Sequence, residues 1–230
     1  MAGGLPQPLM CVVLLFQILF FSLFFSTFSF AKDYEEIFFH VYRNDSKIGF
    51  HKLKIENNQN SKNVEISINF KVKFLGFTLY DYDHKNFEKW IGNDLVKVNS
   101  KTNKNGDLLN CTFVKNENSS KILGTFNPKN FPENLISTSY WNVDLVRGEK
   151  KTVLNTQDCN LIDFKIDNLG IKKIYNNKIL TTHYKLTGKE SSGEDLNIDI
   201  WYDMKGNWVK MIFLKDNSSI EYFLDKFHEE

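Results

Sequence analysis

In the segment from Tyr80 to Trp90, residue types that could take part in binding or catalysis recur at every second position. One alternating set contains Tyr80, Tyr82, His84, Asn86, Glu88 and Trp90, and the other contains Asp81, Asp83, Lys85, Phe87 and Lys89. Because successive side chains of a strand point to opposite faces, the first set would share one face, with His84 and Glu88 about 13 Å apart. On a curved sheet such a face predicts a ligand-binding surface with a few placed polar groups. The alternative is that these residues are good strand formers whose polar ends lie at the rim of a sheet.

His84 and Glu88 also allow a hydrolase hypothesis. General acid–base catalysis needs its groups within hydrogen-bond reach of one substrate atom. Residues four apart on one strand cannot meet, so a neighbouring strand would have to supply a partner for His84. The chain has no Gly-x-Ser-x-Gly motif and no Gly-rich phosphate-binding loop. We therefore expect a non-enzymatic protein without catalytic residues, and a hydrolase that uses His84 is the less favoured alternative.

Composition and spacing argue against metals, cofactors and nucleic acids. The five histidines form no His-x-His or His-x3-His pair, and the acidic residues have no calcium-loop spacing. The formal net charge is +1, without the basic surplus that is typical of a phosphate-backbone binder. The sequence therefore predicts no metal site, no cofactor and no nucleic-acid partner.

Cys111 and Cys159 have no catalytic signature around them. Outside the cytoplasm they could form one disulfide. The alternative is two separate buried thiols, and the geometry of the fold decides between the two.

The N-terminal residues have the properties of a targeting segment. Residues 1–31 contain no charged side chain, residues 9–30 are almost wholly apolar, and Ser29 and Ala31 suit the −3 and −1 positions of a signal-peptidase site before Lys32. We expect a signal peptide over residues 1–31 and one exported domain over residues 32–230. An uncleaved inner-membrane anchor over residues 9–30 is the alternative, because 22 apolar residues can span a bilayer. Either way the domain would be periplasmic or secreted, with membrane contact only through this segment.

After Lys32 the hydrophobic pattern has a period of two. The clearest run is Val64–Phe74, in which apolar residues at even positions alternate with polar residues at odd positions. Similar runs recur with Gly, Asn and Asp turns between them, among them the strong hairpin signal Asn105-Gly106. The pattern predicts a mainly β fold: a curved antiparallel sheet or half-barrel of about 10–12 strands. Residues 127–151 lack the alternation and predict a long loop between the two halves of the sheet, with a short helix near residues 133–146.

Several short strings in the exported part form a recognisable series. They are Asp45-Ser-Lys-Ile-Gly-Phe-His51, Phe74-Leu-Gly76, Tyr80-Asp-Tyr-Asp-His84, Glu88-Lys-Trp90, Thr102-Asn-Lys-Asn-Gly106, Ser139-Tyr-Trp-Asn142, Leu186-Thr-Gly188 and Asp199-Ile-Trp-Tyr-Asp203. Through them the chain resembles the exported bacterial family described as domain of unknown function 6134. The resemblance implies export from a bacterial cytoplasm and supplies no catalytic residues. More loosely, the expected architecture is similar to the half-barrel of lipoprotein carriers, which is a likeness of fold alone.

These observations lead to a candidate binding surface on the concave face of the sheet. Its expected residues are Tyr80, Tyr82, His84, Glu88, Trp90, Tyr140, Trp141 and Trp201. The expected partner is a lipid or another hydrophobic or amphipathic ligand, or a protein of the cell envelope. A structural or interaction module of the envelope, acting through sheet edges, is the alternative.

Overall fold

A computed structural model describes residues 33–117, 119–190 and 192–227. The expected signal peptide and the alternative anchor both lie outside these residues. Residues 33–230 form a compact unit, and its described part contains a hydrophobic core. Among the described residues, no helix has the length and hydropathy to cross a membrane.

The described chain forms one 14-stranded sheet, and its strands follow the period-two pattern closely. The strands are Asp33–Arg43 (β1), Ser46–Asn58 (β2), Ser61–Phe74 (β3), Phe77–Ile91 (β4), Asp94–Lys104 (β5), Asp107–Asn116 (β6), Ser119–Gly124 (β7), Ile136–Ser137 (β8), Lys150–Leu154 (β9), Leu161–Ile174 (β10), Ile179–Lys189 (β11), Asp195–Asp203 (β12), Trp208–Lys215 (β13) and Ser218–Leu224 (β14). Two short 3-10 helices, Val143–Val146 (η1) and Asp225–Phe227 (η2), complete the elements. The predicted mainly β fold is confirmed.

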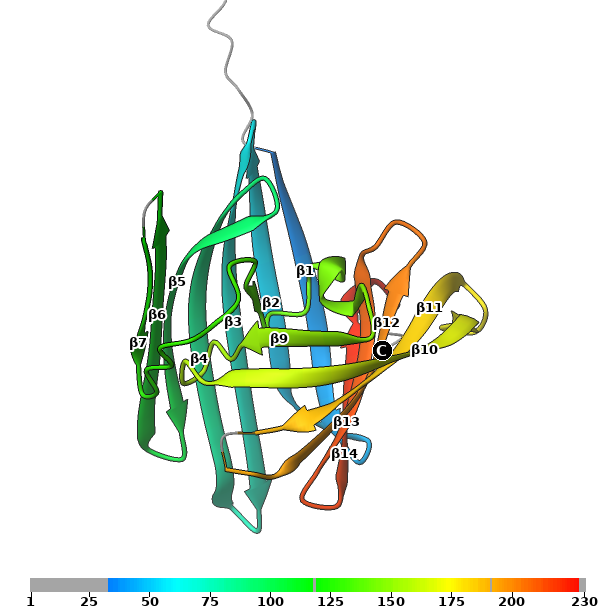
Figure 1. The fold of residues 1–230 in the computed structure, drawn as a ribbon. Coiled ribbons are helices and arrows are strands. Elements are labelled where there is room, and N and C mark those ends of the chain that lie inside the picture. The colour runs from blue at the N-terminus through cyan, green and yellow to red at the C-terminus, as the bar shows by residue number, and fades with distance from the viewer. Residues whose placement is uncertain (1–32, 118, 191, 228–230) are drawn as a thin grey trace, which may run out of the picture. The chain divides into compact units, whose positions relative to one another are not determined.

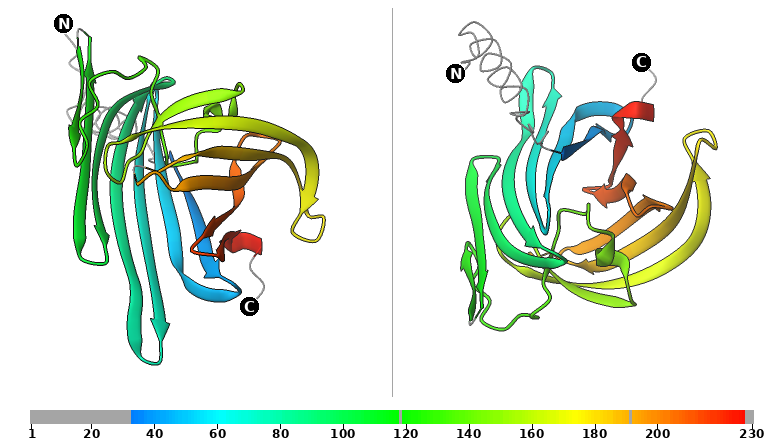
Figure 2. Two further views of the ribbon diagram at one scale, coloured as in Figure 1. Left: turned by 60° about the horizontal axis from the view of Figure 1, so that its bottom comes forward. Right: turned by 90° about the horizontal axis from the view of Figure 1, so that it is seen from above.

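The sheet has two meandering halves that meet where β1 pairs with β14. Its strand order is β7-β6-β5-β4-β3-β2-β1-β14-β13-β12-β11-β10-β9-β8. All pairs are antiparallel except the short parallel pair β8–β9. The sheet rolls up into an open, barrel-like body without closing, and the connection from β7 to β8 passes from one edge to the other (Figures 1 and 2).

The predicted strand number of about 10–12 was too low, because the segment over residues 127–151 contributes β8 and the start of β9. β8 has two residues, too few to show any alternation. β9 has the sequence KKTVL, in which the two buried residues are adjacent rather than alternate. The short helix in this segment exists as η1, which is capped by the Asn142 side chain accepting a hydrogen bond from the Asp144 amide at 3.0 Å.

The core lies inside the roll and is built mainly from one face of each strand. In β3, Val64, Ile66 and Phe70 are buried, whereas Ile68 and Val72 are half-buried. Phe74, expected on the same buried face, is instead exposed because it lies at the tip of the β3–β4 hairpin. Asn105 and Gly106 both have positive φ, 54° and 96°, as the Asn-Gly hairpin signal predicts.

Candidate functional site

The inward face of β4 carries polar side chains into an otherwise apolar core. Tyr82, His84, Asn86, Glu88 and Trp90 are all buried, while the side chains between them are half-buried or exposed. Tyr80 is half-buried at the end of the row. The period-two pattern of β4 therefore translates directly into an inner and an outer face.

Glu88 is fully buried, and its carboxylate accepts four hydrogen bonds. One oxygen accepts from Asn86 Nδ2 at 2.9 Å, and the other accepts from Trp90 Nε1 at 2.9 Å, Ser139 Oγ at 3.3 Å and Trp141 Nε1 at 3.3 Å. Ser139 also lies 2.7 Å from the hydroxyl of Ser137 in β8. A buried carboxylate needs such donors in place of water. Through Ser139 and Trp141, Glu88 therefore fixes the segment that follows β8 to the inner face of β4.

His84 lies four residues before Glu88, on the same face of β4 as Asn86, and two threonine hydroxyl groups flank its ring. Its Nδ1 is 2.8 Å from Thr102 Oγ1 on β5, and its Nε2 is 3.5 Å from Thr156 Oγ1. Burial lowers the pKa of His84 to about 4, although the nearby Asp83 raises it. The ring is therefore neutral at pH 7. Within the described residues, the partners of the two His84 ring nitrogens are therefore threonine hydroxyls.

His51 is a buried histidine whose two ring nitrogens both lack a hydrogen-bond partner. It faces inward from β2 and is in register with Ile68, which is in register with His84. The rings of Phe39, Trp208 and Tyr222 surround it, with centroids 6.5, 5.2 and 5.7 Å from its own. Burial, and then the proximity of His84, lower the pKa of His51 to about 3. Buried polar groups are normally paired, so an imidazole with two unpaired nitrogens needs an explanation.

Tyrosines gather on the same side of the interior as His51. Tyr82 stacks on Phe70 at 5.6 Å, and Tyr80 stacks on Tyr82 at 6.2 Å. Burial raises the pKa of Tyr82 and Tyr222 well above the ordinary value, and nearby phenols, Tyr80 and Tyr140 among them, raise both further. Within the described ranges the hydroxyls of Tyr80, Tyr82 and Tyr222 make no hydrogen bond, unlike that of Tyr202, which donates to the Tyr140 carbonyl at 2.7 Å.

Tyr140 has a backbone conformation that a bulky residue rarely adopts. Its φ is 62°, in the left-handed region. The hydrogen bond from Tyr202 and the Trp208 ring, 5.8 Å away, hold it there. Burial raises the pKa of Tyr140, whose phenol acts electrostatically on Tyr82 and Tyr222. Backbone strain of this kind collects at functional sites.

Trp201 does not belong to this surface, which corrects its expected place on the concave face. Its ring stacks on His183 at 4.1 Å and lies 5.8 Å from Lys210 Nζ, and His183 Nε2 is 2.6 Å from Asp199 Oδ1. The next residue, Tyr202, faces inward. The odd-numbered neighbours of Trp201 in β12 are polar and face outward, and Trp201 shares their face because the strand alternates.

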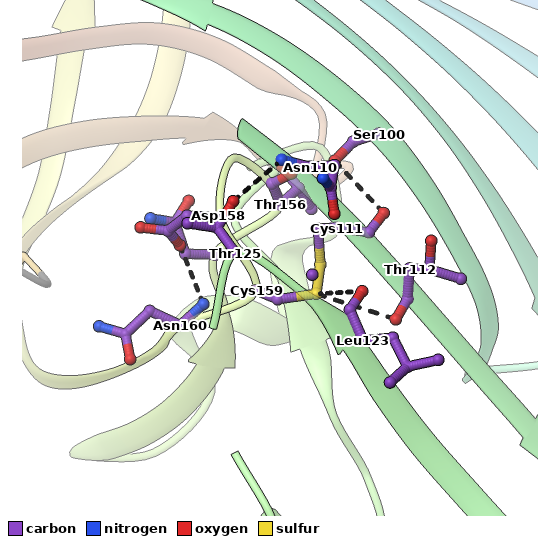
Figure 3. Close-up of a disulfide and its surroundings, with 12 residues drawn as sticks. Ser100, Asn110, Cys111, Thr112, Leu123, Thr125, Thr156, Asp158, Cys159 and Asn160 are labelled. Carbon is purple, nitrogen blue, oxygen red and sulfur yellow. Dashed lines mark hydrogen bonds between the residues drawn. A yellow bond between two sulfur atoms is a disulfide. The ribbon is translucent and has the colours of Figure 1, made fainter. Parts of the chain in front are cut away.

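The two cysteines join opposite parts of the rolled sheet. Cys111 in β6 and Cys159, in the turn between β9 and β10, form a disulfide (Figure 3). The Phe126 amide donates to the Asp158 carbonyl at 2.8 Å, and Ser100 in β5 hydrogen-bonds to the Thr156 carbonyl. A side chain at Gly124 would place its Cβ 2.9 Å from Cys159 Sγ, so only glycine fits there. The disulfide and these hydrogen bonds therefore connect β5, β6 and the residues after β7 to the loop between β9 and β10, which strand pairing does not do.

We define the interior polar cluster as the group of inward-facing residues described above. Its members are His51, Tyr80, Tyr82, His84, Asn86, Tyr140 and Tyr222. Trp90 and Trp141, whose rings meet edge to face at 5.4 Å, lie beside Glu88. Sequence reasoning missed His51 and Tyr222, although each occupies an inward position of an alternating strand: His51 precedes Leu53 and Ile55, and Tyr222 lies between Ile220 and Leu224.

The comparisons with known proteins agree with the fold. The family model described as "Domain of unknown function (DUF6134)" matches residues 39–225. No curated protein matches the sequence. Among solved structures, a β-barrel-like protein of the domain of unknown function DUF1849 from Brucella abortus is similar, with a TM-score of 0.60 and 8% sequence identity. The alignment covers 84% of this chain and 95% of that chain, so it shows a shared fold.

Proposed function

This chain belongs to the DUF6134 family, whose description states no activity, and we propose that it is an exported, non-enzymatic protein that binds an uncharged amphipathic molecule inside its rolled sheet. The observation that carries the proposal is the pair of unpaired ring nitrogens on buried His51. The Asn86 Oδ1 atom is likewise buried without a partner. A bound molecule with a hydrogen-bonding group would satisfy these atoms, which apolar surroundings cannot do.

The electrostatics of the interior favour a ligand without a formal charge. His51 and His84 are neutral at pH 7 because burial lowers each pKa, and the tyrosines are neutral because burial raises theirs. Glu88 already accepts hydrogen bonds from four donors. No cationic side chain of the described residues belongs to the interior polar cluster. A carboxylate or ammonium group would therefore lose its hydration without gaining a counter-charge.

The apolar part of the ligand would contact the ring-lined region around Tyr80 and Tyr82. Tyr80 is half-buried, and its pKa is raised by burial and by the charges of Glu190 and Asp216, which directly follow β11 and β13. Its partial exposure places Tyr80 where the interior approaches solvent. Hydrophobic and aromatic linings with few polar groups are typical of sites for small amphipathic molecules.

Export is the second part of the proposal. The uncharged leader over residues 1–31 and its Ser29-x-Ala31 ending support it. The Cys111–Cys159 disulfide supports it as well, since structural disulfides persist outside the reducing cytoplasm.

The His51→Leu variant tests the proposed site, because we expect the substitution to weaken ligand binding and to raise stability. Leucine has about the volume of imidazole and needs no hydrogen bond, so the ligand-free variant should be more stable by about 1–3 kcal/mol in urea unfolding. The same variant should bind the uncharged probe Nile red at least tenfold more weakly, with dodecanol competing better than dodecanoate in the wild type. His183→Leu, which changes a buried histidine on the outer face, is the matched control and should bind Nile red like the wild type. Equal probe binding by wild type and His51→Leu would refute the proposed site.

A further inference from the structure

The hairpin between β3 and β4 extends beyond the rest of the sheet. β3 pairs with β2 only as far as Phe70, and β4 pairs with β5 only from Tyr82 onward. Asn105, at the β5–β6 turn, reaches no further than the backbone of Asp81. Residues 71–80 therefore form a two-stranded arm of about 13 Å with no neighbouring strand on either side. Figure 1 shows the arm as the lowest part of the ribbon.

The tip of this arm is apolar and exposed. Phe74, Leu75, Phe77 and Leu79 are 62, 81, 74 and 59% exposed. Phe74 and Phe77 are paired across the hairpin, so their rings share one side of it. Soluble proteins rarely expose contiguous apolar groups of this size without a binding role.

The backbone conformation at Leu75 favours glycine, asparagine or aspartate over leucine. Leu75 and Gly76 have φ of 48° and 85°, the left-handed region. Three other hairpins in this chain fill both such positions with Asn, Asp or Gly, namely Asn44-Asp45, Asn105-Gly106 and Asp216-Asn217, although Tyr175 also has positive φ in the β10–β11 turn. A leucine costs more there than asparagine. Turn formation therefore does not account for Leu75, and its apolar side chain at the outermost point suggests a contact made by that side chain.

Basic residues lie directly behind the apolar tip. Lys71 and Lys73 are both exposed, and Lys71 Nζ is 3.1 Å from Asp81 Oδ2 across the hairpin. Asp81 lies directly after the arm, and residues 71–80 contain these two lysines and no acidic residue, so the arm itself is net positive. Apolar side chains followed by lysines match the layers of a membrane surface, where acyl chains lie beneath anionic headgroups.

We propose that the β3–β4 tip inserts into the surface of a lipid bilayer, with Lys71 and Lys73 at the level of the headgroups. A stable protein–protein interface needs roughly 800 Å² of fitted surface on each partner. A narrow convex tip of four side chains does not offer that, whereas lipid acyl chains adapt to any apolar shape. This contact is separate from any contact through residues 1–31, and it does not depend on ligand binding inside the sheet.

Vesicle flotation tests the proposal with the chain of residues 32–230, the part that would remain after the expected signal-peptide cleavage. Vesicles of phosphatidylcholine with one quarter phosphatidylglycerol should bind the wild type. Leu75→Asn combined with Phe77→Thr should lower the partition coefficient at least tenfold, although asparagine suits the turn and both residues are exposed. Lys73→Gln should lower it roughly fivefold on these vesicles and leave binding to pure phosphatidylcholine unchanged.

The matched control replaces two other exposed apolar residues, Ile91→Ser and Leu123→Ser, each 46% exposed in the wild type. It should float like the wild type, and circular dichroism should show all variants folded. The proposal is overturned if the wild type stays unbound, or if the tip variant binds as well as the wild type. A concentration-dependent dimer in light scattering that the tip variant abolishes would assign the tip to a second copy and also overturn it.

Discussion

Replacing Glu88 by alanine should lower the free energy of unfolding by about 4 kcal/mol. The side chain accepts hydrogen bonds from Asn86, Trp90, Ser139 and Trp141, and it is fully buried. Its removal leaves these donors without an acceptor and opens a void, and each buried unpaired donor costs about 1–3 kcal/mol before relaxation. Urea unfolding at pH 7 measures the loss of stability. Hydrogen exchange should be faster over residues 137–146, because the segment that follows β8 is held less firmly.

Glu88→Gln is the matched control. The amide keeps one oxygen for Trp90, Ser139 and Trp141, and the Asn86 side chain can turn its unpaired Oδ1 toward the new NH2 group. We expect this variant to lose only about 1 kcal/mol, because neutral acceptors are weaker than a carboxylate. An alanine variant as stable as the glutamine variant would show that Glu88 does not hold the segment that follows β8.

Acidification from pH 7 to pH 5 should lower the stability of the ligand-free protein by about 4 kcal/mol through His51 and His84. The pKa of each ring is lowered from 6.5 in the folded state, to about 3 and about 4. Below pH 6.5 the unfolded chain therefore binds more protons than the folded one, so stability falls as the pH falls and levels off only near pH 3–4. At pH 5 each histidine accounts for about 2 kcal/mol.

Urea midpoints between pH 7 and pH 5 test this dependence. His51 faces the Phe39, Trp208 and Tyr222 rings and lies near His84, so no carboxylate offsets its protonation. His51→Leu should therefore remove about half of the pH dependence. A wild-type stability that is flat over this range would mean that the two rings are hydrated rather than buried.

Local alternation was sufficient to predict most of the sheet. The even positions of Val64–Phe70 and of Tyr82–Trp90 point inward as predicted, because a strand side chain has only two directions available. The same rule placed Trp201 wrongly only because it was grouped with other aromatic residues and not with its polar odd-numbered neighbours in β12. β8 and β9 escaped prediction because their pairing, not their own pattern, makes them strands.

The site itself depends on contacts between residues far apart in the sequence. Ser139 and Trp141 reach Glu88 across 51 and 53 residues, and Thr156 reaches His84 across 72. Such partners depend on how the sheet rolls, which no local pattern specifies. The pairing of Cys111 with Cys159 likewise follows from the β7–β8 connection crossing from one edge to the other. The sequence could therefore nominate His84 and Glu88, but not assign their partners.

The proposed interior site and the proposed membrane contact of the β3–β4 tip lie near each other in the molecule. Tyr80, where the interior approaches solvent, lies at the base of the same hairpin that carries Leu75 and Phe77 at its tip. A tip seated in lipid would bring the tyrosine-lined part of the interior close to the bilayer. The two proposals remain separable, since flotation needs no ligand and Nile red binding needs no vesicle.

Native mass spectrometry of the protein isolated from the exported fraction of its own cells tests the central claim most directly. We predict the mass of residues 32–230 with one disulfide, accompanied by a single uncharged amphiphile that dissociates on collisional activation. The His51→Leu chain, isolated in parallel, should carry much less of it. A wild-type chain that consistently arrives without any bound molecule would contradict binding inside the sheet and would favour a purely structural role in the envelope.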